Sequence, residues 1–199
     1  MNATFSLHNK PGRLMSFVAE ALGRIQPSAT IFVTRKAREL KRSGRDVLFL
    51  SVGEPDFDTP DNIKQAATEA MRAGATKYTP TAGTRELQRA IIDFYEREFG
   101  RQFNPSEVMA TAGGKQAIFN AVVSLVNPGD EVLIAKPYWV TFPEIVTFAR
   151  ATPVFIESEE SDFVLTADEV RRAITPRTKL IILNSPSNPS GRVIPPKEL

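Results

Sequence analysis

The chain has 199 residues and a mass of 22.0 kDa, with 42% hydrophobic and 24% charged residues, so it can bury a core and does not have a disordered composition. It contains no cysteine and a single histidine, which excludes disulfides, thiolate metal sites, a cysteine nucleophile and histidine-based metal clusters. A net charge of +2 is too small to indicate a nucleic-acid partner.

The amino-terminal residues carry no recognisable targeting signal. Residues 1–14 lack the apolar stretch of a signal peptide, and no apolar run approaches the roughly 18 residues that a membrane span needs. We therefore expect a cytoplasmic protein without a membrane partner. We also expect residues 1–14 to form an unordered extension and translation to start at Met1 or Met15.

The first predicted helix is capped by Ser28 and ends before Gly44. A nucleic-acid-binding face is one interpretation of its charge, but no aromatic side chains are interleaved for stacking, so we favour a solvated basic face. This face consists of Arg35, Lys36, Arg38, Lys41, Arg42 and Arg45. The β-prone sequence VLFLS then predicts a short strand at residues 47–51.

Two amphipathic helices are predicted next. The first begins at Pro60 and ends at Gly74, and the second is capped by Thr84 and ends at Gly100. The apolar residues of the second helix recur at helical spacing and predict a buried stripe, formed by Leu87, Ala90, Ile91 and Phe94.

From residue 107 onward, short strands alternate with helices. The strands are predicted at 107–111, 132–135, 154–156 and 179–184, and the helices at 115–126, 138–148 and 167–174. The last strand is apolar almost throughout, which is typical of burial on both faces. This order predicts an α/β fold with a mostly parallel sheet flanked by helices. Because the chain stops where a further helix is due, we expect it to be the amino-terminal part of a longer protein.

Four loops follow predicted strands, at the edge where parallel sheets bind ligands. Gly113 and Gly114 open a helix whose free N–H groups could bind a phosphate, although a tight turn without a ligand is the alternative. Trp139 could stack on a planar ring or simply pack. Asn188 lies between two prolines and could present a donor and an acceptor at a fixed position, although a loop with only a turn role is the alternative. Gly53 could offer its backbone N–H to an anion. One ligand with a phosphate, an aromatic ring and a carboxylate would use all four loops.

The motifs VGEPDFDTP, TKYTPTAGTREL, ATAGGKQAIFNA, LVNPGDEVLIAKPYWVTFPE and RAITPRTKLIILNSPSNPSG occur in this order. Together they resemble the class I aminotransferases, which are fold type I enzymes that use pyridoxal 5′-phosphate. The similarity extends over about residues 15–199 and is greatest to the bacterial aspartate aminotransferase subgroup, with its aspartate/prephenate-type members.

The resemblance implies roles for individual residues. Gly114 and Lys115 would bind the cofactor phosphate, and Trp139 would stack on the pyridine ring and border the substrate. Asn188 would bond the ring hydroxyl and lie beside the substrate carboxylate. No metal site is implied.

Two further roles concern the substrate and the assembly. Gly53 would contact the substrate carboxylate through its backbone. Tyr78 would reach the phosphate of the neighbouring subunit, which implies a homodimer. The expected substrates are aspartate and 2-oxoglutarate.

The resemblance also divides the chain. Residues 15–60 would form the arm and helix of a small domain, and residues 61–199 the first part of the large cofactor-binding domain. The lysine that forms the Schiff base would lie beyond Leu199, so no catalytic residue is assigned and the segment alone should not transaminate. Two alternatives remain open: another fold type I enzyme, such as a lyase or synthase, or an inactive truncated product.

Overall fold

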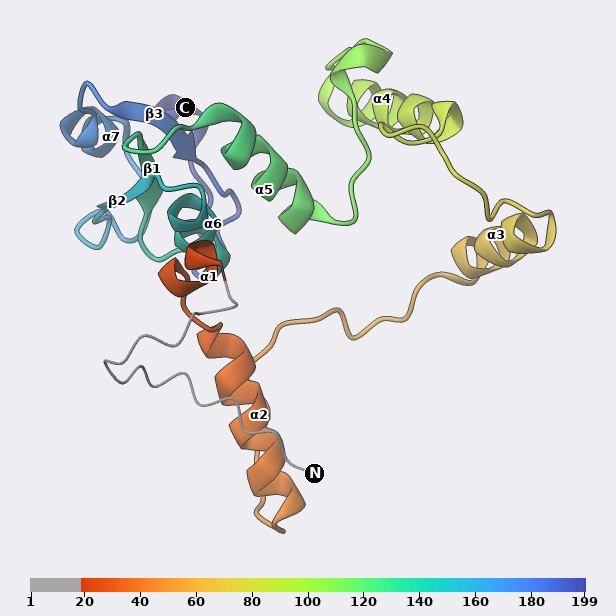
Figure 1. Cartoon of the computed structure of the whole chain (residues 1–199), viewed down its shortest axis with the longest axis horizontal. Helices are drawn as coiled ribbons and strands as arrows, with labels where there is room; N and C mark the ends of the chain where they lie inside the picture. The colour runs from red at the N-terminus through yellow and green to blue at the C-terminus, as the bar shows by residue number, and fades with distance from the viewer. Residues whose placement is uncertain (1–18) are drawn as a thin grey trace.

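The computed structural model describes residues 19–199, so the expectations for residues 1–14 and for Met15 lie outside the described residues. Figure 1 shows a sheet-bearing unit formed by the carboxyl-terminal half and by α1, with three further helices extending from it. Those three are α2 (Ala29–Arg42), α3 (Asp61–Arg72) and α4 (Arg85–Phe99). The sheet-bearing unit comprises α1 (Glu20–Arg24), α5 (Gly114–Leu125), β1 (Glu131–Ala135), α6 (Thr141–Phe148), β2 (Thr152–Ile156), α7 (Ala167–Ala173) and β3 (Thr178–Ile182).

The predicted helix caps are confirmed. The Ser28 hydroxyl accepts a hydrogen bond from the Ile31 N–H at 3.4 Å, and the Thr84 hydroxyl accepts one from the Leu87 N–H at 3.2 Å. Gly100 ends α4 in the left-handed conformation at φ 63°, where a side chain would be strained. Local capping chemistry therefore sets the bounds of these helices.

The predicted strand at residues 47–51 is wrong, because this segment is not in a sheet. It runs back beside α2, with the Ser51 hydroxyl 3.0 Å from the Thr34 hydroxyl. The Leu50 residue is 94% exposed. An extended apolar segment becomes a strand only when a neighbouring strand accepts its hydrogen bonds, and in the described part of the chain this segment has no such neighbour.

The predicted strand at residues 107–111 is also wrong. A 3₁₀ turn, η1 (Pro105–Glu107), begins this region, and residues 108–111 are irregular. The stripe predicted on α4 is likewise not buried, since Leu87 and Phe94 are about half exposed and the buried residue of α4 is Ile92. Figure 1 shows the reason, because α3 and α4 lie away from the sheet.

The predicted parallel sheet is confirmed. Its strand order is β2-β1-β3, and β1 pairs in parallel with both neighbours. Strand β3 is half-buried rather than fully buried as predicted, because it forms an edge of this sheet. Helix α6 joins β1 to β2, and helix α7 joins β2 to β3, so each parallel crossover contains a helix, as parallel pairing requires.

Alternate residues of β1 face two separate cores, as the two-residue period of a strand dictates. Val132 and Ile134 pack among apolar residues of α5 and α6 on one face. Leu133 packs with Ile156 and Leu165 on the other face, next to α7. The sheet is therefore the middle of three layers.

The remaining helix predictions hold with small changes. Helix α6 begins at Thr141 rather than at residue 138, and Pro143 lies in its first turn, where proline is tolerated. Helix α7 begins with a capping box, in which Thr166 and Glu169 are bonded reciprocally. A short 3₁₀ turn, η2 (Pro196–Glu198), follows the last loop. Within residues 19–199, no helix combines the length and the apolar character needed to cross a membrane.

Candidate functional site

The amino-terminal end of α5 is an open cradle of backbone N–H groups. Gly113 caps the helix at φ 86°, and its carbonyl oxygen accepts from the N–H groups of Gln116 and Ala117 at 3.2 and 3.4 Å. The N–H groups of Gly114 and Lys115 have no carbonyl acceptor within the helix, as at any helix start. A Cβ atom added at Gly113 or Gly114 would meet no atom within 4 Å. Space, free donors and the positive end of the helix dipole thus coincide, which suits an anion.

Trp139 lies beside this helix start. It stands between β1 and α6, half-buried, with its ring edge-on to Phe142 at a centroid distance of 5.4 Å. The Lys115 Nζ atom lies 5.1 Å from the centroid of the Trp139 ring, which is a cation–π contact. Two of the predicted site residues therefore meet in the folded chain. The group that covers this face of the indole ring is a flexible lysine side chain, which a ligand ring could displace.

Asn188 belongs to the loop that follows β3. Its backbone N–H donates to the Asn184 Oδ1 atom at 2.9 Å, and the Asn184 side-chain amide donates to the Pro186 carbonyl at 3.2 Å. The Asn188 residue is exposed. The backbone of this position is thus held by local hydrogen bonds while its amide group stays available to a ligand.

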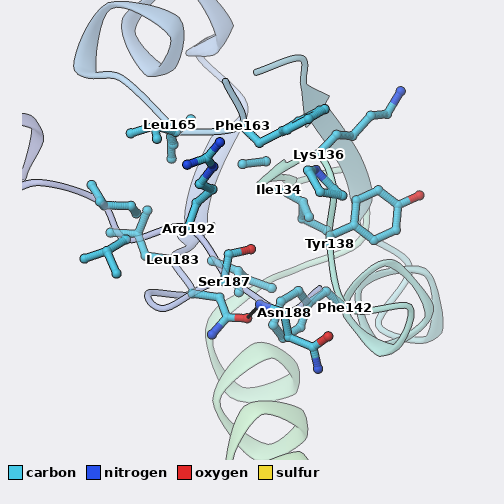
Figure 2. Close-up of a pocket in the computed structure, with 17 residues that line it drawn as sticks. Ile134, Lys136, Tyr138, Phe142, Phe163, Leu165, Leu183, Ser187, Asn188 and Arg192 are labelled. Atoms are coloured by element: carbon cyan, nitrogen blue, oxygen red, sulfur yellow. Dashed lines mark hydrogen bonds between the residues drawn. The ribbon is translucent and has the colours of Figure 1, made fainter. Parts of the chain in front are cut away.

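A small cleft lies at the carboxyl ends of β1 and β3 (Figure 2). Its free volume is about 30 Å³, enough for a water-sized molecule. Polar groups at its rim come from the loops after both strands, namely Lys136, Tyr138, Ser187, Asn188 and Arg192. The loop after β1 that leads to Trp139 and the loop that carries Asn188 therefore border one hollow.

Gly53 and Tyr78 lie on other parts of the chain. Gly53 is exposed in the irregular segment between α2 and α3, and the Tyr78 residue is fully exposed between α3 and α4. Within residues 19–199, no hydrogen bond, ion pair or aromatic contact joins either residue to the helix start, the indole or the loop after β3. Their roles stay predictions.

Sequence reasoning missed two ion pairs at the cleft. The Lys136 Nζ atom lies 2.5 Å from the Glu157 Oε1 atom, and Arg192 pairs with Asp162. The hydrogen bond to Glu157 raises the pKa of Lys136 above its ordinary value. Both pairs join segments 21 or 30 residues apart in sequence, and no local pattern signals such contacts.

A flat aromatic ligand with a phosphate group fits these residues. The free N–H groups of α5 and the Lys115 ammonium can donate hydrogen bonds to a phosphate, and the half-buried indole offers a face to a ring. Trp139 follows β1, at the carboxyl end where ligands of parallel sheets bind, and its contact with Lys115 brings the start of α5 to the same place.

Known proteins resemble this chain in sequence. It is 53% identical over 186 residues to the aspartate/prephenate aminotransferase of Cereibacter sphaeroides, covering 93% of this chain and 46% of that protein. It is 45% identical over 183 residues to the aspartate aminotransferase of Geobacillus stearothermophilus, covering 92% of this chain and 47% of that protein. The chain spans about half the length of the curated relatives it matches.

Solved structures agree. The aspartate aminotransferase of Thermus thermophilus with maleate superposes with a TM-score of 0.88 at 47% identity, over 92% of this chain and 48% of that chain. An alanine aminotransferase from Pyrococcus furiosus gives a TM-score of 0.85 at 32% identity, over 90% and 47%. The family model described as aminotransferase class I and II matches residues 45–199. With its fold type I architecture, the chain belongs to the class I and II aminotransferases, a family that uses pyridoxal 5′-phosphate.

Proposed function

We propose that this chain supplies the phosphate- and ring-binding part of a pyridoxal-phosphate-dependent aminotransferase that moves an amino group between aspartate and 2-oxoglutarate. The observation that carries the proposal is the 5.1 Å contact between the Lys115 ammonium and the Trp139 ring at the start of α5. This contact places a hydrogen-bond donor for the phosphate next to a stacking surface for the ring, as a phosphorylated pyridine requires.

Each residue has a distinct task in this proposal. The N–H groups of Gly114 and Lys115 hold the phosphate, and the Lys115 ammonium leaves the indole face to pair with it. Trp139 covers one face of the ring and keeps water from it. The exposed Asn188 amide offers a donor and an acceptor to the ring hydroxyl and the substrate carboxylate. The bound cofactor supplies the electron sink for reactions at the amino-acid α-carbon.

The substrates and the assembly are also proposals. Several relatives are aspartate or aspartate/prephenate aminotransferases, which supports aspartate as the amino donor. We assign the substrate carboxylate to the Gly53 N–H. We propose that Tyr78 contacts the cofactor phosphate bound by the neighbouring subunit of a cytoplasmic homodimer. The full exposure of Tyr78 leaves it available for this contact. Residues 15–60 would belong to a small domain and 61–199 to the large one, while the Schiff-base lysine would come from the part of the relatives that this chain does not span.

Pyridoxine 5′-phosphate tests cofactor binding directly, because it lacks the aldehyde that reacts with any lysine. Trp139 is the only tryptophan of the chain, so quenching of its fluorescence reports on this site alone. We expect saturable quenching by pyridoxine 5′-phosphate and much weaker binding of pyridoxine, which lacks the phosphate. Equal affinities for the two ligands, or no quenching, would contradict the proposal.

Gly114→Pro isolates one backbone donor. Proline is tolerated at the first helical position and removes only the N–H there. Gly114→Ala is the matched control, because it keeps the N–H and its Cβ meets no atom within 4 Å. A hydrogen bond to a charged group contributes about 1.5–3 kcal/mol, so the proline variant should bind pyridoxine 5′-phosphate about tenfold or more weakly, and the alanine variant normally. Equal affinities of the two variants would exclude this N–H as a ligand.

Amino transfer is tested on a chimera in which the carboxyl-terminal half of the Cereibacter sphaeroides relative follows this chain. We expect it to transfer an amino group from aspartate to 2-oxoglutarate. A chimera that binds pyridoxal 5′-phosphate but does not turn over aspartate would refute the substrate assignment.

A further inference from the structure

The connection between β2 and α7 contacts both loops of the candidate site. We call its residues 157–163 the rim turn. The Glu157 carboxylate pairs with Lys136 at 2.5 Å, and the Asp162 carboxylate pairs with Arg192. Figure 2 shows Phe163 of the rim turn at the edge of the cleft, with Lys136 and Arg192 on either side of it. One short segment is therefore tied by charge to the loop after β1 and to the loop after β3.

The rim turn is itself held firmly by the fold. The Ser158 side chain is buried, and its hydroxyl donates to the Lys136 carbonyl. The Phe163 N–H donates to the Ser158 carbonyl at 2.7 Å, which closes the turn. The Ser161 hydroxyl donates to the Glu169 Oε1 atom at 2.6 Å and so fastens the turn to α7. A segment fixed in this way can restrain the loops that are bonded to it.

On one side, the segment that leads to Trp139 is held by the rim turn through Lys136 and by the end of β2. The Lys136 N–H donates to the Ile156 carbonyl at 2.9 Å, and its ammonium lies 5.4 Å from the Phe155 ring centroid. The Tyr138 ring stacks on the same Phe155 ring at 4.9 Å with an interplanar angle of 14°. Lys136 and Tyr138, directly before Trp139, are thus both held against β2.

On the other side, the rim turn holds the loop that carries Asn188. The Ser187 N–H donates to the Arg192 carbonyl at 2.8 Å, and the Gly191 N–H donates to the Ser187 carbonyl at 2.7 Å. The loop is thus bonded to the backbone of Arg192, whose guanidinium is paired with Asp162.

We propose that Glu157 and Asp162 are positioning residues that set the relative placement of Trp139 and Asn188. The proposal rests on the function proposed above, in which Trp139 and Asn188 flank the cofactor ring. Neither carboxylate touches the ligand. Each acts through a basic residue of a site loop, and the two ion pairs together make the rim turn a common support for both loops.

Hydrogen exchange in the ligand-free chain tests the loop after β3. Asp162→Asn should make the amides of Ser187 and Gly191 exchange roughly 2- to 5-fold faster at low salt, the range expected from losing an exposed ion pair. Asp162→Glu should restore slow exchange, and Glu160→Gln is the matched control, because Glu160 is exposed on the same turn and forms no ion pair within residues 19–199. Equal exchange in Asp162→Asn and Glu160→Gln would overturn the proposal.

Ligand binding tests the loop after β1. Glu157→Gln should shift the emission of Trp139 and weaken binding of pyridoxine 5′-phosphate several-fold without lowering the melting temperature, while Glu160→Gln changes neither. If the wild-type chain does not bind this ligand but Asp162→Asn still speeds exchange, the proposed function fails and the loop support stands. If the wild-type chain binds it and neither variant has an effect, the support role alone is refuted.

Discussion

Replacing Lys115 with methionine removes one positive charge from the first turn of α5 and keeps a side chain of similar length. In the ligand-free chain, the ammonium lies on the Trp139 ring at 5.1 Å. In the proposed complex, it pairs instead with the phosphate. The variant therefore loses one interaction in each state, and the change in affinity is the difference between them.

The magnitude follows from these two interactions. A hydrogen bond to a charged group contributes about 1.5–3 kcal/mol, and an exposed cation–π contact contributes about 0.5–1 kcal/mol. The net loss of binding free energy is then about 1–2 kcal/mol, which weakens binding of pyridoxine 5′-phosphate roughly 5- to 30-fold. Because Lys115 is exposed, the loss should shrink as salt is added.

Fluorescence of Trp139 measures both affinities, and pyridoxine without its phosphate is the internal control. Lys115→Met should not weaken pyridoxine binding, because the ammonium no longer competes for the indole face. Lys197→Met, the same charge change at an exposed lysine of η2, should leave both ligands unaffected. If Lys115→Met bound pyridoxine 5′-phosphate as tightly as the wild-type chain, the phosphate site would not be at α5.

Three further outcomes are expected. Trp139→Ala should weaken binding of both pyridoxine and pyridoxine 5′-phosphate about tenfold or more, as measured by calorimetry, because stacking of a flat heterocycle contributes about 1–3 kcal/mol. Unchanged binding would show that the ligand ring does not stack on the indole. Leu133→Ala, at a residue only 1% exposed, should lower the free energy of unfolding in urea by about 2–5 kcal/mol, whereas Leu48→Ala, at a residue 85% exposed, should not. The Thr175 hydroxyl is the main cause that holds the pKa of Glu131 below its ordinary value, so this carboxylate stabilises the fold above its unfolded pKa and loses that effect as pH falls through the folded pKa. The melting temperature of Glu131→Gln should therefore drop less between about pH 6 and about pH 3 than that of the wild-type chain, and parallel curves would contradict this role.

Helices were predictable because their ends are encoded locally. The hydroxyls of Ser28 and Thr84 and the left-handed Gly100 act within a few residues, so the sequence alone places these boundaries. The strands of the sheet-bearing unit were also predictable, because each is a short apolar run in regular alternation with helices. The segments at 47–51 and 108–111 failed because strand formation depends on a distant partner, which no local pattern reveals.

In the candidate site too, locally encoded features were predictable and contacts between distant segments were not. The free N–H groups at Gly114 and the exposed Asn188 follow from the turn chemistry of their own loops, and both were predicted. The meeting of Lys115 with Trp139 was predicted only as part of one ligand site, and its 5.1 Å geometry came from the packing of α5 on α6. The ties from the rim turn were not predicted, because ion pairs between distant segments depend on the finished fold.

A structure of this chain with pyridoxine 5′-phosphate tests the central claim most directly. The account predicts phosphate oxygens within about 3.2 Å of the N–H groups of Gly114 and Lys115, with the pyridine ring lying flat on Trp139. A phosphate bound elsewhere, for example on the basic face of α2, or a ring turned away from the indole would contradict it.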